Sequence, residues 1–278
     1  MIEYLKYIVL GIVQGISEIL PISSSGHTVL TERLLNLQLA SEDLALLSVF
    51  MHFASLIAIV VFFWKEIWLM IKHTFLYLFG KDKEKRSEYR EGLFLFLYVV
   101  VASVPVGLVG LLLADKVTEI FGKLLIIGIF FVVNGLILLF VGLFKKAAPE
   151  SEFGWKNIMI TGLFQCIGVL PGISRSGITM SGAKIAGLDD EKAKKFAFLL
   201  FLPVSAGSFV FSLPDLVTMS TDQTHLLPYF VVATIFSLGF TFLALFFIFK
   251  KFHFGHYKWF AIYMFMVGLF TIIYSVVI

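Results

Sequence analysis

Long apolar runs dominate the pattern of hydrophobic and polar positions along this chain. Six of them are long enough to cross a hydrocarbon core of about 30 Å at about 1.5 Å per helical residue. They occupy residues 44–64, 92–113, 124–144, 196–213, 227–249 and 259–278. The runs are continuously apolar and do not alternate, which favours helices over the strands of a membrane barrel. We therefore predict an all-α integral membrane protein with six transmembrane helices.

Two further segments are interrupted by polar residues in a way that the six runs are not. They are residues 14–28 (QGISEILPISSSGHT) and 165–179 (QCIGVLPGISRSGIT). Each contains a proline followed by serines and glycine, so we predict a helix that enters the membrane, breaks and returns. At an offset of 151 positions the two copies agree at Gly11/Gly162, Gln14/Gln165, Ser23/Ser174, Ser25/Ser176, Gly26/Gly177 and Thr28/Thr179.

Three predicted crossings separate the two copies, and an odd number reverses the direction of the chain. The sequence therefore predicts an inverted-topology repeat with two re-entrant helix pairs, one entering from each face. Repeat 1 covers about residues 1–144 and repeat 2 about 155–278 of a single membrane domain, 1–278. Repeats of this kind place their functional site near the bilayer midplane. We expect residues 21–26 and 171–177 to meet there in a polar pocket.

Composition and charge agree with this topology and orient it. Hydrophobic residues make up 59% of the chain and charged residues 15%, too few to cover a protein of this size in water. With the loop at residues 65–90 in the cytoplasm, 17 of the 22 Lys and Arg residues lie on that side and four on the other. The first helix pair then enters from outside, and the pocket opens outward. We predict a charged loop at residues 80–91 and a charged turn at residues 189–195.

Glu18 and Arg175 are the ionisable residues at the two breaks. Each would cost about 2.5 kcal/mol or more if left in hydrocarbon, so each needs a partner or a wet cavity. The two side chains either face one another or share a ligand. Gln14 lies one helical turn before Glu18, and this spacing lets an amide and a carboxylate hold one proton, one hydroxyl group or one divalent ion.

The hydroxyl groups of the first break follow Pro21 directly. Ser23, Ser24, Ser25 and Gly26 offer hydroxyls and free N–H groups where a helix starts anew, which is typical of an anion site. The next residue is His27, the residue type suited to proton transfer near neutral pH.

At the second break, Arg175 stands between Ser174 and Ser176 and is followed by Gly177. A guanidinium, two hydroxyls and exposed amides offer many donors and a fixed charge, which favours phosphate or diphosphate as the ligand. We interpret His52 as a core histidine or a neighbour of this site. Cys166 is the single cysteine, which excludes an internal disulfide and a thiolate metal cluster.

At these residues the chain resembles the bacterial undecaprenyl-diphosphate phosphatase family, the bacitracin-resistance membrane phosphatases. Gln14 and Glu18 followed by residues 20–27 (LPISSSGH) form one of its motifs, and residues 171–177 (PGISRSG) form the other. The resemblance covers essentially the whole chain. Gln14 stands where many members carry Glu, and Asn157 stands where Asp is common.

The resemblance implies six crossings, two re-entrant pairs and removal of the terminal phosphate from a C55 polyprenyl diphosphate. It also implies a divalent cation, Mg²⁺ or Ca²⁺, with Gln14 and Glu18 as the candidate ligands. Glu18, Ser24, His27 and Arg175 fall on the family's proposed catalytic positions. The product is the monophosphate carrier used in cell-wall synthesis.

The resulting hypothesis is a phosphatase whose clamp is Arg175 with the neighbouring serines. Ser24, His27 and water all remain open as the nucleophile. The alternative is an inverted-repeat transporter or polyprenyl-phosphate flippase. We expect a polyprenyl diphosphate and membrane lipids as partners, no nucleic acid, and a location in the bacterial plasma membrane. A homodimer is left open.

Overall fold

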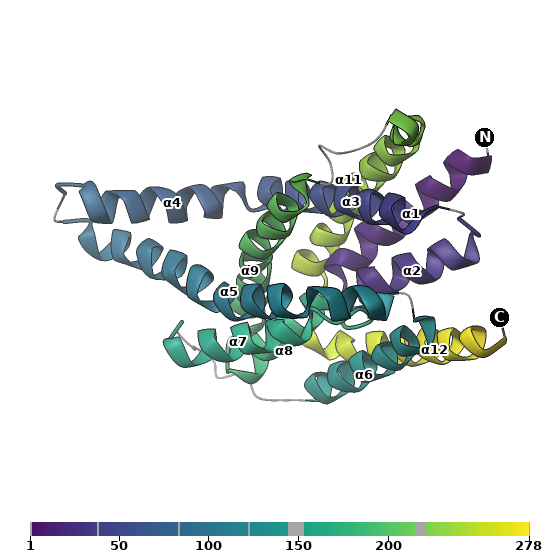
Figure 1. The fold of residues 1–278 in the computed structure, drawn as a ribbon. Coiled ribbons are helices and arrows are strands. Elements are labelled where there is room, and N and C mark those ends of the chain that lie inside the picture. The colour runs from purple at the N-terminus through teal and green to yellow at the C-terminus, as the bar shows by residue number, and fades with distance from the viewer. Residues whose placement is uncertain are drawn as a thin grey trace.

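A computed structural model describes residues 2–37, 39–82, 84–121, 123–143, 153–214 and 221–277 (Figure 1). These residues form helices and no strand. Six helical segments are long and apolar enough to cross a membrane: Glu42–Phe62, Arg86–Leu113, Leu124–Leu143, Asp190–Phe211, Thr224–Lys250 and Phe254–Val277. The predicted all-α class and the six predicted crossings are confirmed, and the chain is a multi-pass membrane protein.

The helices follow one another in the same order in both halves of the chain. In the first half they are α1 (Ile2–Ile19), α2 (Ser24–Leu34), α3 (Ser41–Phe62), α4 (Trp64–Phe79), α5 (Arg86–Phe121) and α6 (Leu124–Leu143). In the second half they are α7 (Trp155–Ile167), α8 (Arg175–Ile185), α9 (Asp190–Phe211), α11 (Leu227–Lys250) and α12 (Tyr257–Val277). Two 3₁₀ turns, η1 (Thr221–Leu226) and η2 (Phe254–His256), precede α11 and α12.

Two segments predicted as charged loops are partly helical, and those predictions were wrong. Helix α5 begins at Arg86, inside the predicted loop, and runs back beside α4 (Figure 1). The guanidinium of Arg86 lies 5.1 Å from the centre of the Tyr77 ring of α4. Helix α9 begins at Asp190 because the Asp189 side chain caps it, accepting from the Lys192 N–H at 2.8 Å. The hydrophobic pattern does not predict either helix start. The start of α5 depends on contacts with α4, and the start of α9 depends on the Asp189 cap.

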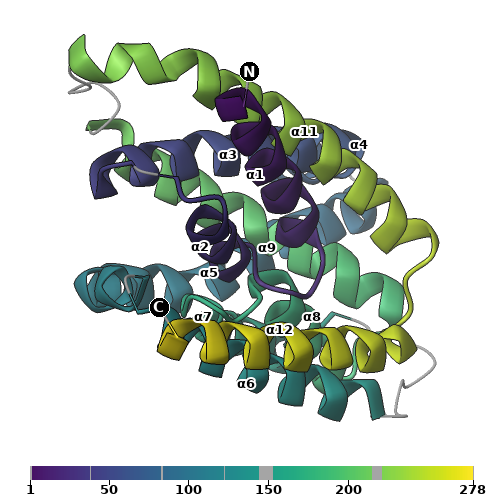
Figure 2. The ribbon, with the colours of Figure 1, turned by 90° about the vertical axis from the view of Figure 1, so that its right-hand side faces the viewer.

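Each short helix pair packs against a long helix of the other half. In the first pair α1 lies along α11, and in the second pair α7 lies along α5. Helix α3 also packs on α11, and α9 packs on α5. Helices α6 and α12 lie side by side, as both ribbon views show (Figure 2). The packing partners of one half therefore match those of the other. That the short pairs are re-entrant and the repeats inverted stays a prediction.

Glycines allow α1 to approach α11 closely. A Cβ added at Gly11 would lie 2.3 Å from the carbonyl oxygen of Ala233, and one at Gly15 would lie 2.5 Å from that of Ser237. Small residues spaced four apart let two helix backbones touch in a membrane. This contact fixes the position of α1, and with it the first polar stretch.

Candidate active site

The two polar stretches meet at the breaks between their short helices. The first break lies between Ile19 and Ser24, and the second between Ile167 and Arg175. The hydroxyls of Ser174 and Ser176 both donate to the carbonyl oxygen of Leu20, at 3.3 and 3.1 Å. The sequence predicted this meeting from the polar interruptions alone, and the hydrogen bonds confirm it.

Asn134 of α6 joins the two breaks from the side. Its side-chain nitrogen donates to the Pro21 carbonyl at 3.0 Å, and its side-chain oxygen accepts from the Ser174 N–H at 3.1 Å. Asn134 is fully buried, and each of these bonds satisfies a backbone group that the helix breaks leave free. One amide thus fixes both polar stretches to α6.

A serine caps the helix that follows each break. The Ser23 side chain accepts from the Gly26 N–H at 3.4 Å to start α2, and the Ser174 side chain accepts from the Gly177 N–H at 3.0 Å to start α8. Ser23 has a φ of 70°, a left-handed conformation that is strained for a residue with a side chain. Two helix N-termini, which attract anions, therefore begin at the junction of the two stretches.

The remaining predicted binding residues hold the two stretches together. Ser23 and Ser25 lie with their hydroxyl oxygens 3.4 Å apart, and those of Ser174 and Ser176 are 3.1 Å apart. A Cβ added at Gly26 would lie 2.4 Å from a ring carbon of Phe131. One at Gly177 would lie 2.9 Å from the Cβ of Pro21. Gly177 is therefore required for the close approach of the two stretches, and Gly26 for the close approach of the first stretch to α6.

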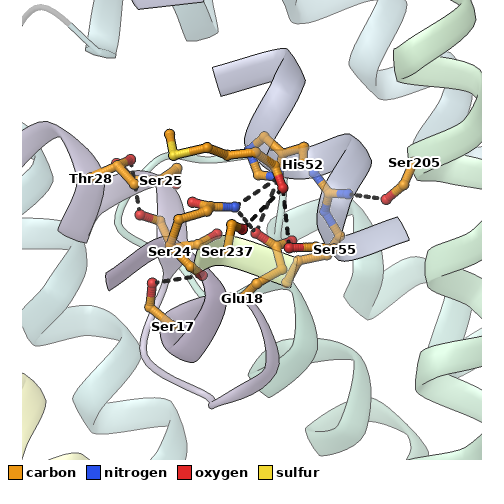
Figure 3. A network of polar contacts seen from close by, with 12 residues as sticks. Ser17, Glu18, Ser24, Ser25, Thr28, His52, Ser55, Ser205 and Ser237 are labelled. Carbon is orange, nitrogen blue, oxygen red and sulfur yellow. Dashed lines mark hydrogen bonds and ion pairs between the residues drawn. The ribbon is translucent and has the colours of Figure 1, made fainter. Parts of the chain in front are cut away.

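Glu18 is buried at the centre of a group of polar side chains from α1, α2 and α3 (Figure 3). The Gln14 side-chain nitrogen donates to Glu18 Oε2 at 2.7 Å, and His52 Nδ1 lies 3.1 Å from the same oxygen. The Ser24 side chain interacts with the carboxylate as well. Because Gln14 and His52 share Oε2, the carboxylate is held in a fixed orientation next to a hydroxyl.

Arg175 is half-buried and is held without a direct ion pair. Its Nη1 donates to the Ser205 hydroxyl at 3.3 Å, and its guanidinium lies 5.5 Å from the centre of the Phe201 ring. No carboxylate that the structure describes lies within 4.0 Å of it. Of the two arrangements expected for Glu18 and Arg175, direct pairing is absent among the described residues, and a shared ligand stays a prediction.

His27 is buried, and both of its ring nitrogens have partners. Nδ1 lies 2.8 Å from the Ser23 carbonyl oxygen, and Nε2 lies 2.8 Å from the Tyr263 hydroxyl of α12. A carbonyl oxygen only accepts, so Nδ1 carries a proton, and in the neutral imidazole Nε2 is then the acceptor for the Tyr263 hydroxyl. The Tyr263 ring stacks on the imidazole, with centroids 5.6 Å apart and an interplanar angle of 10°.

The donor set around Glu18 fits a cation shared with a phosphate ligand. Among the described residues, no group of three His, Cys, Asp or Glu side chains could hold a metal ion on its own. Magnesium is commonly bound by one or two carboxylates plus substrate phosphates. Glu18 supplies one carboxylate, and the carbonyl oxygen of Gln14 points away from Glu18, since its nitrogen faces the carboxylate. Glu18 therefore fits such a cation as its one carboxylate ligand, Gln14 in this orientation presents an N–H donor to that carboxylate, and the described residues form no complete protein cage.

Sequence reasoning missed several residues of this site. His52 is not one of them: of its two interpretations, a core histidine or a neighbour of the site, the structure shows the neighbour, with Nδ1 3.1 Å from Glu18 Oε2. Asn134 and Ser205 are polar residues within apolar spans, which is a signal that could have found them. Tyr263 gave no signal, because aromatic residues are frequent throughout the chain. Asn157 lies at the start of α7, where its side-chain oxygen accepts from the Gly154 N–H at 2.7 Å.

Comparison with known proteins adds to this geometry. The family model of bacitracin resistance protein BacA matches residues 7–270. The undecaprenyl-diphosphatase 1 of Bacillus cereus is 32% identical over 270 residues, which cover 97% of each chain. The undecaprenyl-diphosphatase of Acholeplasma laidlawii is 34% identical over 276 residues, 98% of this chain and 97% of that one. The undecaprenyl-diphosphatase of Methanosphaera stadtmanae is 35% identical over 287 residues, with both chains fully covered. These comparisons give no support to the transporter or flippase alternative.

Proposed function

Because this chain belongs to the family of bacitracin resistance protein BacA, we propose that it hydrolyses undecaprenyl diphosphate to the monophosphate and inorganic phosphate. The observation that carries the proposal is the junction of the two polar stretches. A carboxylate beside a hydroxyl on one stretch lies near a guanidinium without an ion pair on the other. Regeneration of the lipid carrier in this way serves cell-wall synthesis and accounts for bacitracin resistance.

In this proposal the diphosphate binds between the N-termini of α2 and α8. Arg175 supplies the fixed positive charge, and Ser205 and Phe201 keep its guanidinium in place. The N–H groups at the two helix starts add donors for the phosphate oxygens. Phosphoryl transfer depends mainly on positioning and charge neutralisation, and this arrangement supplies both.

The attacking group in this proposal is the Ser24 hydroxyl. Glu18 accepts its proton while the oxygen bonds to the terminal phosphorus and the bond to the bridging oxygen breaks, which releases the lipid monophosphate. A water molecule then attacks the phosphoserine while Glu18 returns its proton to the departing Ser24 oxygen. Dihydrogen phosphate leaves, and both Ser24 and the Glu18 carboxylate are regenerated. His27 is the weaker candidate for the nucleophile, because its Nε2 already accepts from Tyr263.

A divalent cation, Mg²⁺ or Ca²⁺, would complete the proposed site, held by Glu18 together with the substrate. When bound, it would neutralise charge on the phosphate oxygens. Gln14 and His52 keep the Glu18 carboxylate oriented toward this position.

We also propose that the protein lies in the bacterial plasma membrane with the site open to the outside. The concentration of Lys and Arg in the loops on one side supports this orientation. In a Cys166→Ala background, a membrane-impermeant thiol reagent should label Asn36→Cys in intact cells and Lys81→Cys only after permeabilisation. The reverse labelling pattern would overturn the orientation and leave the proposed chemistry unaffected.

Phosphate release tests the enzymatic proposal. Purified protein in detergent with Mg²⁺ should release phosphate from farnesyl or undecaprenyl diphosphate, and Arg175→Ala should lower kcat/KM by roughly 100- to 1,000-fold. Arg33→Ala, which removes an exposed arginine at the end of α2, is the matched control and should retain full activity. Absence of phosphate release by the wild-type protein would reject the proposal.

A further inference from the structure

Tyr263 is the residue outside the two polar stretches that contacts His27 most directly. It lies on α12, 236 positions away in sequence, and its hydroxyl is 2.8 Å from His27 Nε2. The Tyr263 ring is also nearly parallel to the imidazole, with an interplanar angle of 10°. Tyr263 therefore restrains both the hydrogen bonding and the orientation of His27.

His27 in turn holds the residue that precedes Ser24. The Ser23 carbonyl oxygen accepts from His27 Nδ1 at 2.8 Å and from the His27 backbone N–H at 3.2 Å. Ser23 needs this support because its φ of 70° is unfavourable for a serine. The peptide that carries the Ser23 carbonyl leads directly into Ser24, so its orientation sets where the Ser24 hydroxyl lies.

We propose that Tyr263 is a positioning residue for the phosphatase reaction. Its hydroxyl donates a hydrogen bond to Nε2 of His27 and keeps this nitrogen unprotonated. The proton then lies on Nδ1, which donates to the carbonyl of the strained Ser23. This hydrogen bond fixes the peptide before Ser24 and places the Ser24 side chain beside Glu18. This inference rests on the proposed function. In this inference His27 supports the start of α2 through its hydrogen bond to Ser23, and Ser24 remains the nucleophile that attacks phosphorus.

Tyr263→Phe removes the hydroxyl and keeps the stacked ring. We expect kcat to fall by roughly 3- to 10-fold, the effect of one hydrogen bond, with KM for farnesyl diphosphate changed by less than about twofold. Tyr274→Phe is the matched control: this tyrosine lies on the same helix and stacks on Phe270, away from the site. It should leave both constants unchanged.

A double-mutant cycle separates positioning from general packing. His27→Asn keeps a side-chain N–H that can donate to the Ser23 carbonyl but has no atom equivalent to Nε2. In this background Tyr263→Phe should have no further effect on kcat, because the contact it removes no longer exists. An equal loss in both backgrounds would show that Tyr263 acts through packing alone and would overturn the proposal.

Nitrogen NMR of histidine-labelled protein gives a readout that does not depend on turnover. The His27 resonances are assigned by their disappearance in His27→Asn. Their chemical shifts should show a protonated Nδ1 and an unprotonated Nε2. Tyr263→Phe should change the Nε2 shift alone. A protonated Nε2 would overturn the inference. If the wild-type protein shows the expected tautomer and Tyr263 coupling but releases no phosphate, the proposed function fails and the contact itself stands.

Discussion

The two polar stretches have the same framework and different chemistry. Both consist of a short helix, a break and a second helix capped by a serine, Ser23 in one and Ser174 in the other. The first stretch carries the carboxylate and the imidazole, and the second carries the guanidinium. At the offset of 151, Arg175 corresponds to Ser24 and Glu18 corresponds to Val169. The two copies thus share a backbone geometry but carry different ionisable groups, and neither copy alone contains the complete candidate site.

The corresponding glutamines show the same divergence in their contacts. Gln14 donates to Glu18, whereas Gln165 donates to the Leu200 carbonyl at 3.3 Å. The side-chain oxygen of Gln165 is buried and has no hydrogen-bond partner among the described residues. The first copy uses its amide to orient a carboxylate, and the second uses it to bind a neighbouring helix.

The largest effect should come from the carboxylate that only the first stretch possesses. Glu18→Gln keeps the shape of the side chain but removes the base, and kcat/KM in the phosphate-release assay should fall by roughly 10²- to 10⁴-fold. Glu3→Gln, on the same helix and paired with Lys6 at 3.0 Å, should retain activity. A Glu18→Gln enzyme within about tenfold of wild type would contradict the assignment of acid–base chemistry to the first stretch.

Separating the two stretches should cost the most stability. Asn134→Ala leaves the buried Pro21 carbonyl and Ser174 N–H without partners, so the free energy of unfolding should fall by roughly 2–4 kcal/mol. Thr234→Val, which removes a hydroxyl bonded within its own helix, is the control and should cost less. Denaturation in detergent measures both. Equal costs would mean that Asn134 does not join the stretches.

The two capping serines should respond with opposite signs to the same substitution. Ser23→Gly loses a cap but relieves a left-handed strained conformation, so stability should stay level or rise by about 1 kcal/mol. Ser174 has a φ of −75°, so Ser174→Gly loses the cap and the hydrogen bond to the Leu20 carbonyl with no relief, and stability should fall by about 1 kcal/mol. Thermal unfolding in detergent measures the pair. A loss of the same size at both positions would indicate that Ser23 is not strained.

The smallest effect should come from the glutamine of the second stretch. Gln165→Met removes a buried oxygen that lacks a partner and keeps the side-chain volume, so stability should change by less than about 1 kcal/mol and activity should be retained. Gln14→Met removes a donor to a charged group and should lower kcat/KM by roughly 10-fold or more. Similar activities for the two variants would mean that the copies have not diverged at this position.

Much of the architecture could be predicted from the sequence because a bilayer imposes length and apolarity on every crossing. The long apolar runs predicted from the sequence correspond to helices α3, α5, α6, α9, α11 and α12. The meeting of the two breaks could be predicted because Glu18 and Arg175 are too costly in hydrocarbon to be solitary. Residues whose role depends on a distant partner could not be found, as with Tyr263, which contacts a histidine from the opposite end of the chain. The helical start of α5 depends in the same way on its contact with α4.

The crossed packing of the halves, α1 along α11 and α7 along α5, also constrains how the protein is made. During synthesis α1 and α2 leave the ribosome first, yet the helix against which α1 packs ends at Lys250. The second pair meets its partner at once, since α5 is already in the membrane when α7 emerges. The N-terminal pair must therefore wait for its main packing partner until α11 has been inserted. A chain truncated before α11 lacks the helix against which α1 and α3 pack.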